Sequence, residues 1–245
     1  MTELSVVIPC HNEEDNIEAC IRGFCAVISQ KTASFEILVV EDGSSDQTPA
    51  ILSRLEQTIP ELRVLRPSVN LGHGGAIRMG YEAAEGAWIF QTDSDNQYDP
   101  ADFLKLYEKT ANFDFILGWR RLRHDPPHRR MLSTGLRVLL WILFGVQVKD
   151  PNCPFRLMRH DFVKSFLAAL PPEVFILNTL LSVTAWTGPS RRMEIEIRHF
   201  ARSKGVSIHG GNLVRAVFRG GLELLQFRIG NQAGKINNAL YPFTA

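Results

Sequence analysis

The sequence predicts an α/β fold in which helices flank a mostly parallel central sheet. Short apolar runs alternate with amphipathic segments of helical length through the first hundred residues. Polar residues gather just after several of these runs, where parallel sheets bind their ligands. The 245 residues, 45% hydrophobic and 22% charged, have an ordinary globular composition, which excludes disordered, collagen-like and low-complexity chains.

The predicted elements follow one another in a regular order. Strands are expected at residues 5–8, 36–40, 63–65 and 87–91, which are short buried runs rich in β-branched or aromatic residues. Helices are expected at residues 13–28, 48–59 and 74–84, where apolar residues recur with helical spacing. This alternation is typical of parallel strands joined by helical crossovers. Further along, residues 174–186 predict an apolar helix and residues 192–199 a half-buried strand.

The net charge of +1 conceals a division along the chain. Residues 1–118 contain 19 acidic and 8 basic residues, whereas residues 119–245 contain 7 acidic and 19 basic residues. An acidic part suits a divalent cation with a sugar or ribose, and an arginine-rich part suits phosphate or an anionic membrane surface. The alternative is that both sets of charges are merely solvated. We expect one domain over residues 1–245, with 1–118 and 119–245 serving different tasks.

Two segments bear on membrane association. Residues 138–146 form the longest apolar run, about half of the ~20 residues that a spanning helix needs, so this run is either a core helix or a helix in the headgroup layer. Residues 212–229 have a basic amphipathic pattern that suits an anionic membrane, a dimer contact or ordinary packing, although Gly220 and Gly221 weaken a continuous helix. With no signal-peptide pattern at the N-terminus, we expect a cytoplasmic chain at the membrane face.

The cysteine pattern and the arginine content exclude two further classes. The four cysteines form no C-x-x-C pair and lack histidines at ligand spacing, so they are expected to be reduced thiols rather than zinc ligands. The arginine-rich part contains no interleaved aromatic platform, so no nucleic-acid partner is expected.

Three predicted strand ends carry the polar residues. These are residues 9–13, 41–46 and 93–97. Asn12 and Asp46 could be helix N-caps, and for Asp46 capping is the favoured interpretation. For Asp42 a ligand role is favoured, since a carboxylate just past a strand can accept hydrogen bonds from ribose or a base, and Gly43 allows the sharp turn beside it.

The segment from Asp93 to Gln97 predicts a metal site. Alternate residues at an extended strand end point the same way, so the carboxylates of Asp93 and Asp95 and the amide oxygen of Gln97 can converge on one hard cation. Mg²⁺ or Mn²⁺ fits such oxygen ligands, particularly where open coordination positions remain for a diphosphate.

Four blocks of sequence resemble one known family. SVVIPCHNEEDNI, VVEDGSSDQT, NLGHGGAIRMG and TDSDNQYDP, in this order, are similar to glycosyltransferase family 2 and its polyprenyl-phosphate (dolichol-phosphate mannose or glucose synthase-like) branch. The resemblance resumes at DPNCPFR, residues 150–156. It implies a GT-A, Rossmann-like fold and inverting, metal-dependent transfer of a sugar from a nucleotide diphosphate to a polyprenyl phosphate.

The resemblance also implies roles for individual residues. The expected nucleotide-binding residues are Pro9, Asn12, Glu13, Glu41, Asp42, Asn70, Gly72, Asp93 and Ser94. The expected metal ligands are Asp93, Asp95 and Gln97, with Mg²⁺ or Mn²⁺ as cofactor. The expected acceptor-phosphate residues are Arg120, Arg129, Ser133 and Arg202. Glu41 stands where the family commonly has Asp, and Cys10 with His11 replaces a more usual Thr-Tyr, which leaves uracil and guanine both open as the donor base.

Transfer of a sugar to a lipid phosphate depends more on positioning the two substrates than on a strong base. A lipid phosphate is already ionised at neutral pH, so its oxygen can attack the sugar without losing a proton. The resemblance implies Asp95, Asp150 and Arg120 as the catalytic residues. Asp150 is either a base, which a saccharide hydroxyl acceptor would require, or a group that orients Arg156, which is the interpretation favoured for a phosphate acceptor. A family member with a saccharide acceptor, a non-catalytic nucleotide-sugar-binding module and a homo-oligomer stay open as alternatives.

Overall fold

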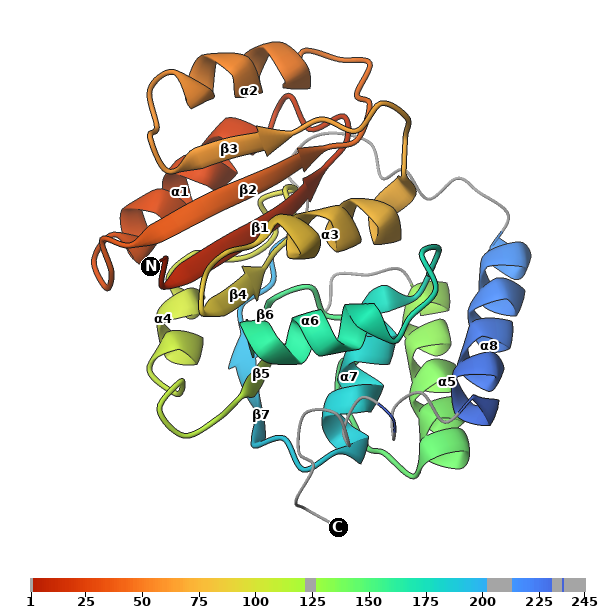
Figure 1. Ribbon diagram of the computed structural model, residues 1–245. Helices are drawn as coiled ribbons and strands as arrows, with labels where there is room; N and C mark the ends of the chain where they lie inside the picture. Colours follow the sequence, from red (N-terminus) through yellow and green to blue (C-terminus); the bar gives the residue numbers. More distant parts are fainter. Residues whose placement is uncertain (1, 122–126, 202–212, 231–234, 236–245) are drawn as a thin grey trace.

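The computed structural model describes residues 2–121, 127–201, 213–230 and 235 (Figure 1). Its described strands form one seven-stranded sheet in the order β3-β2-β1-β4-β6-β5-β7. The strands are β1 (Leu4–Cys10), β2 (Phe35–Glu41), β3 (Leu62–Leu65), β4 (Trp88–Gln91), β5 (Phe115–Arg120), β6 (Arg156–Arg159) and β7 (Arg192–Ile197). β6 runs antiparallel to β4 and β5, while the other neighbouring strands are parallel. The predicted mostly parallel sheet is confirmed.

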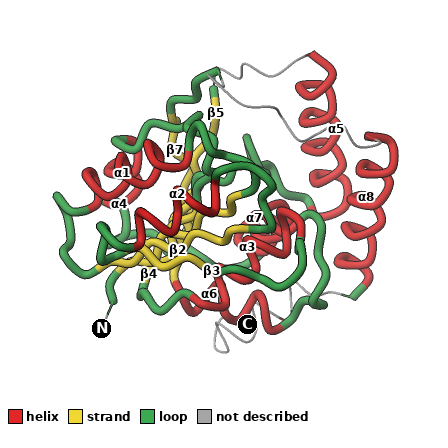
Figure 2. The backbone as a smooth tube through the Cα atoms, turned by 90° about the horizontal axis from the view of Figure 1, so that it is seen from above, coloured by secondary structure: helices red, strands yellow, loops and turns green. Residues whose placement is uncertain are grey.

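Helices cover both faces of this sheet (Figures 1 and 2). They are α1 (Ile17–Ile28), α2 (Thr48–Glu56), α3 (Gly72–Ala83), α4 (Asp102–Tyr107), α5 (Pro127–Phe144), α6 (His160–Ala168), α7 (Leu177–Thr187) and α8 (Leu213–Ile229). α1 contacts α2 and α4, whereas α3 contacts α6 and α7. The two groups form the layers on either side of the strands.

The core explains why these segments fold as they do. Every residue of β1 is buried, as expected for a central strand covered by helices on both faces. α1 buries one face, made of Ile17, Cys20, Ile21, Phe24 and Ile28. Burying a large apolar side chain such as Phe24 contributes about 1.5–3 kcal/mol. Phe24 packs on Phe90, whose ring centroid lies 4.8 Å from that of Phe155. Aromatic packing therefore supports the loop that follows β4 and the segment that precedes β6.

The strand directions bring distant segments to one edge of the sheet. β1, β2, β4 and β5 all end at this edge, which we call the carboxyl edge. Because β6 runs the opposite way, the segment 150–155 that precedes it lies at the same edge. α5 follows β5 and leads to this segment, so it is also connected at both ends to the carboxyl edge. Residue 118 lies within β5, so the change in charge along the chain does not coincide with an interruption of the sheet.

α5 and α8 lie side by side at one side of the molecule (Figures 1 and 2). The rings of Phe144 and Phe227 join them, with centroids 6.2 Å apart. α8 continues through its two glycines. Gly220 lies against Ile176, where an added Cβ would come within 3.2 Å of a side-chain carbon, so the missing side chain allows this close packing. Among the described residues, none of the helices has the length and apolarity needed to cross a membrane.

Candidate active site

Asn12 joins the loops that follow β1 and β2. Its backbone has a φ of 55°, a left-handed conformation that asparagine tolerates better than most residues. Its backbone N–H donates to Ser44 Oγ at 2.9 Å, and its side-chain Oδ1 accepts from the Ser45 N–H at 2.8 Å. The N-cap position of α1 is held by Asn16, so the capping interpretation of Asn12 is wrong. Asn12 instead fixes one predicted nucleotide-binding loop against the other.

Asp46 directly precedes Gln47, which holds the N-cap position of α2, and its side chain bonds to the start of that helix. Its Oδ1 accepts from the Thr48 N–H at 2.9 Å, in the first turn of α2, and its Oδ2 accepts from the Glu14 N–H at 3.2 Å. Burial alone would raise the pKa of Asp46, but the hydrogen bonds from Thr48 and Glu14 outweigh it and lower the pKa. The carboxylate stabilises the start of the helix.

The remaining predicted residues of the β1 end are buried within the structure. Pro9 lies opposite Val40 in the β1–β2 register and is covered on both faces. Glu13 is also buried; its N–H donates to Thr48 Oγ1 at 2.9 Å, and its carboxylate accepts from Asn16 Nδ2 at 2.8 Å. Both residues therefore stabilise the end of β1. That either of them contacts a nucleotide stays a prediction.

Asp42 is the centre of the polar contacts after β2. Its Oδ1 accepts from the Leu71 N–H at 2.6 Å, and its backbone carbonyl accepts from Asn70 Nδ2 at 2.7 Å. The carbonyl also lies 2.8 Å from Nδ1 of His11. The Gly72 N–H donates to Asn70 Oδ1 at 3.0 Å, and Gly72 has a φ of 69° that favours glycine at this position. The structure thus brings together three predicted nucleotide-binding residues, Asp42, Asn70 and Gly72.

Glu41, Ser94 and His73 extend this group. Glu41 is the last residue of β2, and its carboxylate accepts from the Ser44 N–H at 2.6 Å. Ser94, buried after β4, bonds to the side chain of Cys10 at the end of β1. His73, at the start of α3, feels the charges of both Asp42 and Asp95. Its side chain reaches solvent, yet the surrounding protein lowers its pKa by desolvation, and the two carboxylates oppose that shift.

The predicted metal loop follows β4. Asp93 and Asp95 are half-buried. Asn96, which lies between Asp95 and Gln97, has a left-handed backbone conformation with a φ of 60°. The Gln97 N–H donates to Asp95 Oδ1 at 3.2 Å, while its side-chain Nε2 donates to the Phe200 carbonyl at 2.9 Å. Within the described residues, no three His, Cys, Asp or Glu side chains cluster as a metal site. The loop thus offers the two carboxylates of Asp93 and Asp95 to a hard cation. The Gln97 side chain anchors the loop to the segment after β7.

Arg120 and Asp150 form a nearly enclosed ion pair at the carboxyl edge. Arg120 Nε donates to Asp150 Oδ2 at 2.7 Å and Nη2 donates to Oδ1 at 3.1 Å, a two-pronged geometry that arginine suits. The Arg120 side chain is 11% exposed and that of Asp150 is 5% exposed. Burial would lower the pKa of Arg120, but the negative charge of Asp150 contributes to raising it. The guanidinium is thus held in one orientation with its charge retained.

The structure corrects the predicted partner of Asp150. Arg156, which Asp150 was expected to orient, is completely buried and donates instead to backbone carbonyls. Its Nε donates to Cys153 O at 3.0 Å and its Nη1 to Asn178 O at 2.8 Å. Arg156 therefore fixes the segment that carries Asp150, and Asp150 orients Arg120.

Tyr98 links the metal loop to this ion pair, and sequence reasoning gave it no role. Arg120 Nη1 donates to the Tyr98 hydroxyl at 3.3 Å, and the Tyr98 ring packs on Phe155 with centroids 5.5 Å apart. Burial raises the pKa of Tyr98 well above its ordinary value, so the hydroxyl stays protonated. Its place directly after Gln97 was the signal that could have drawn attention to it.

The other predicted acceptor residues are only partly described. Ser133 lies half-buried on α5. Arg129 also belongs to α5, but its side chain lies outside the described part of the chain, and Arg202 lies outside it entirely. The grouping of these residues around one phosphate stays a prediction.

Comparisons with known proteins identify the class. Glucosyl-3-phosphoglycerate synthase from Mycobacterium tuberculosis, in complex with Mn²⁺ and UDP-glucose, aligns with a TM-score of 0.66 at 20% identity, covering 94% of this chain and 79% of that one. S. aureus TarS 1–349, in complex with UDP-GlcNAc, aligns with a TM-score of 0.67 at 18% identity, covering 99% and 73%. These likenesses confirm the predicted GT-A fold. A family model, glycosyl transferase family 2, matches residues 5–167, and the chain belongs to that family.

Curated relatives agree with the predicted branch. Undecaprenyl-phosphate 4-deoxy-4-formamido-L-arabinose transferase of Edwardsiella ictaluri is 29% identical over 210 residues, covering 84% of this chain and 63% of the relative. Dodecaprenyl-phosphate galacturonate synthase of Rhizobium johnstonii is 29% identical over 230 residues, covering 91% and 65%. The chain spans less than two thirds of the length of these relatives. Both names contain a polyprenyl phosphate, as the resemblance implied.

Proposed function

We propose that this chain transfers a sugar from a UDP- or GDP-linked donor to the phosphate of a polyprenyl lipid, with inversion at the anomeric carbon. The observation that carries the proposal is the enclosed Arg120–Asp150 pair, which lies at the same edge of the sheet as the acidic loops after β2 and β4. One edge would hold the donor and the acceptor phosphate next to each other. The relatives named for polyprenyl phosphates support this acceptor class.

The donor would lie across the ends of β1, β2 and β4. Asp42 and Asn70 would bond to the ribose or base, and Asn12, which joins the loops after β1 and β2, would help to enclose the nucleoside. The complexes of structural neighbours with UDP-sugars support a uridine donor as the first to test.

Asp93 and Asp95 would hold a divalent cation, Mg²⁺ or Mn²⁺. Their donor chemistry fits such an ion: two carboxylates, with the remaining positions left for the diphosphate, water or the Gln97 amide oxygen. When bound, the ion offsets the negative charge that develops on the departing nucleoside diphosphate. The Gln97 contacts with Asp95 and Phe200 keep the loop in place for this task.

Arg120 would bind the acceptor phosphate. Asp150 engages two of its N–H groups and Tyr98 accepts from a third, so the plane of the guanidinium is set and its remaining N–H groups would meet an anion. An ionised phosphate needs no base to deprotonate it, and Asp150, occupied by Arg120, has an orienting role in this scheme. Holding donor and acceptor in line would provide most of the rate enhancement.

Mass spectrometry of the lipid tests the proposal. A short polyprenyl phosphate is incubated with the protein, Mg²⁺ or Mn²⁺, and a panel of UDP- and GDP-sugars, with Asp95→Asn as the matched control. We expect the lipid to gain one sugar mass, only with metal and only with Asp95 intact. Metal-dependent binding of UDP or GDP without any lipid product would overturn the acceptor assignment and direct the search to saccharide hydroxyls.

A further inference from the structure

Two arginines hold the ends of β7 through the same kind of contact. Arg191 directly precedes the strand, and its backbone N–H and guanidinium both donate to the carboxylate of Asp114. Arg198 directly follows the strand, and its backbone N–H and guanidinium both donate to the carboxylate of Asp102. The two arginine side chains are similarly exposed, at 59% and 52%. They differ in position, because Arg191 lies where β5 and β7 begin and Arg198 lies at the carboxyl edge, where both strands end.

Asp102 gives Arg198 a fully buried partner. It is the first residue of α4, a helix that packs beside β7 (Figure 1), and Lys105 also contacts it at 2.8 Å. Burial would raise the pKa of Asp102, but the hydrogen bonds and charges of Lys105 and Arg198 outweigh it and lower the pKa. Arg198 Nη1 also lies 2.8 Å from Asp99 Oδ2. We call the contacts of Arg198 with Asp99 and Asp102 the Arg198 clamp, which joins the chain after β7 to the chain that leaves the metal loop.

The segment beyond the Arg198 clamp pairs with the metal loop. The Phe200 N–H donates to the Gln97 carbonyl at 2.9 Å, and Gln97 Nε2 donates to the Phe200 carbonyl at 2.9 Å. Next to this pair, Tyr98 forms an antiparallel bridge with His199, and the centroids of their rings lie 5.4 Å apart. Because a carbonyl only accepts, the nitrogen of the Gln97 amide is the end that meets Phe200, and its oxygen is the end that a cation would meet.

We propose that Arg198 is a positioning residue for the metal loop. The Arg198 clamp keeps Phe200 opposite Gln97, so it fixes the amide that is predicted to join Asp93 and Asp95 around the cation. Removing a group that orients a metal ligand commonly weakens metal binding about 10- to 100-fold. The inference rests on the proposed function for the identity of the site, whereas the clamp and the binding of metal can be tested without any sugar transfer.

The Arg198 clamp also supports the acceptor part of the site, through Tyr98. Tyr98 lies between Gln97 and Asp99 in the chain, and its hydroxyl accepts from Arg120 Nη1 at 3.3 Å. A loop that shifts at Gln97 would therefore also change the contact with Arg120. Loss of the clamp should raise both the Mn²⁺ concentration needed for half-maximal transfer and the KM for the lipid phosphate, with a smaller decrease in kcat when both are saturating.

Titration with Mn²⁺ tests the inference. The free ion is followed by electron paramagnetic resonance, with UDP and, separately, with GDP present. Arg198→Ala should weaken Mn²⁺ binding about tenfold. Arg198→Lys keeps the charge but lacks the planar fork that can meet two carboxylates, so it should weaken binding by a smaller factor. Arg191→Ala is the matched control, because it removes the same kind of contact at the other end of β7, and it should bind Mn²⁺ as the unchanged protein does.

Hydrogen exchange measures the clamp itself, without donor or metal. The backbone amides of residues 95–101 should exchange several-fold faster in Arg198→Ala than in the unchanged protein, and at unchanged rates in Arg191→Ala. The two variants should lower the thermal midpoint by similar amounts, because each removes an exposed arginine that pairs with carboxylates. A difference in loop exchange at similar stability is what a positioning role predicts and a merely stabilising role does not.

Three results would overturn the inference: Mn²⁺ binding that Arg198→Ala leaves unchanged, an equal weakening in Arg191→Ala, or loop exchange that is the same in both variants. An unchanged protein that binds no Mn²⁺ would remove the metal site and the inference with it. The proposed function can fail separately. If the unchanged protein binds Mn²⁺ with a nucleotide but adds no sugar to the lipid, the acceptor assignment falls, while the Mn²⁺ titration still decides the role of Arg198.

Discussion

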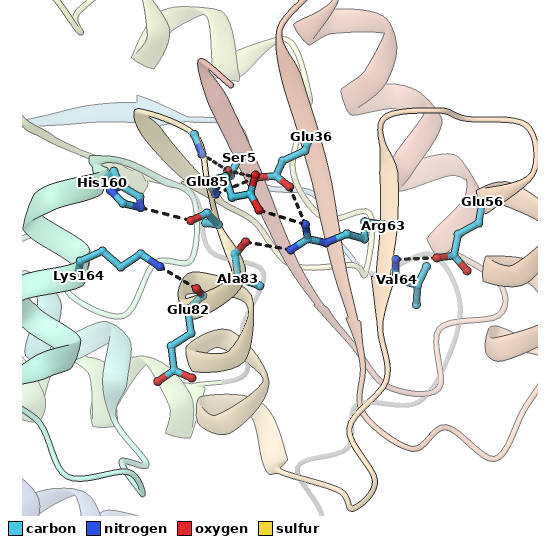
Figure 3. A network of polar contacts seen from close by, with 12 residues as sticks. Ser5, Glu36, Glu56, Arg63, Val64, Glu82, Ala83, Glu85, His160 and Lys164 are labelled. Atoms are coloured by element: carbon cyan, nitrogen blue, oxygen red, sulfur yellow. Dashed lines mark hydrogen bonds and ion pairs between the residues drawn. The ribbon is translucent and has the colours of Figure 1, made fainter. Parts of the chain in front are cut away.

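The two ends of the parallel strands use similar residues for different purposes. At the amino edge, where β1, β2 and β3 begin, polar groups are bonded to one another (Figure 3). Ser5 Oγ donates to Glu36 at 2.6 Å, the Glu85 N–H donates to the same carboxylate at 2.9 Å, and Arg63 lies 3.7 Å from each of the Glu36 and Glu85 carboxylates. There the acidic and basic charges offset each other within the fold.

At the carboxyl edge Asp150 is paired with Arg120, but the acidic groups at the end of β2 have a different kind of partner. Glu41 and Asp42 accept hydrogen bonds from the backbone N–H groups of Ser44 and Leu71. A neutral amide orients a carboxylate but does not cancel its charge. Within the described residues, the amino edge joins Glu36 and Glu85 to the guanidinium of Arg63, whereas Glu41 and Asp42 at the carboxyl edge are oriented by backbone amides. Such an edge suits a cation, and the comparison teaches that the role of a carboxylate depends on its partners together with its place in the fold, since Asp46 also meets amides but supports the start of α2.

The largest expected effect comes from Asp95→Asn, at the carboxyl edge. The substitution keeps the size of the side chain and removes one of two carboxylates, so sugar transfer should fall about 100- to 1,000-fold. The thermal midpoint should hardly change, because the Gln97 N–H can donate to the amide oxygen instead. Initial rates and thermal unfolding measured on the same preparation check this. A large loss of stability with little loss of rate would place Asp95 among the supporting residues.

A smaller effect is expected from Asp150→Asn. Losing a charge-assisted pair with Arg120 should raise KM for the lipid phosphate and lower kcat/KM about 10- to 100-fold, with a smaller change in kcat. Kinetics at varied acceptor concentration check it, with the donor saturating. If kcat collapses while KM stays constant, Asp150 acts as a base and not as the orienting group.

A still smaller loss of activity is expected from Tyr98→Phe, which tests a second contact of Arg120 at the carboxyl edge. It removes only the hydroxyl that accepts from Arg120 Nη1 and keeps the ring that packs on Phe155. The expected loss in kcat/KM is about 2- to 10-fold, because the hydrogen bond is long at 3.3 Å and Asp150 still orients the guanidinium. Since the ring stays in place, the unfolding midpoint should be nearly unchanged, and an unchanged rate would exclude Tyr98 as a positioning residue.

The smallest effect on activity is expected at the amino edge, from Glu36→Ala. Removing this carboxylate takes away the acceptor of the Ser5 hydroxyl and one of the two acceptors of the Glu85 N–H, so the free energy of unfolding should fall by about 1–3 kcal/mol. For a chain of this size each kcal/mol lowers the thermal midpoint by about 2–4 °C. Transfer measured well below the midpoint should change less than about twofold, and a larger decrease would break the division between the two edges.

The sequence was most informative where local patterns decide the structure. The alternation of strands and helices predicted the parallel part of the sheet, and the strand ends located the polar loops, because parallel strands must end together. β6 was not predicted, since the local sequence of a four-residue strand does not show that it runs antiparallel to its neighbours. α4 and α6 were not predicted either.

The pairing of side chains across the site depended on the tertiary fold. Arg120 and Asp150 were both chosen from the sequence, but Asp150 was assigned to Arg156, its near neighbour in the chain. The inverted β6 brings the segment before it next to the end of β5, and only that topology gives Arg120 its partner. Arg156, turned inward, bonds to carbonyls that no spacing rule connects to it.

The most direct test of the carboxyl edge as the site of transfer to a lipid phosphate compares two acceptors of equal chain length, a polyprenyl phosphate and the corresponding polyprenol. Both are offered with the donor sugar nucleotide and metal, and the lipid products are weighed by mass spectrometry. We predict one added sugar on the phosphate and none on the alcohol, with the product strongly reduced in Arg120→Ala. A glycosylated polyprenol, or a phosphate product that forms equally well without Arg120, would contradict the assignment.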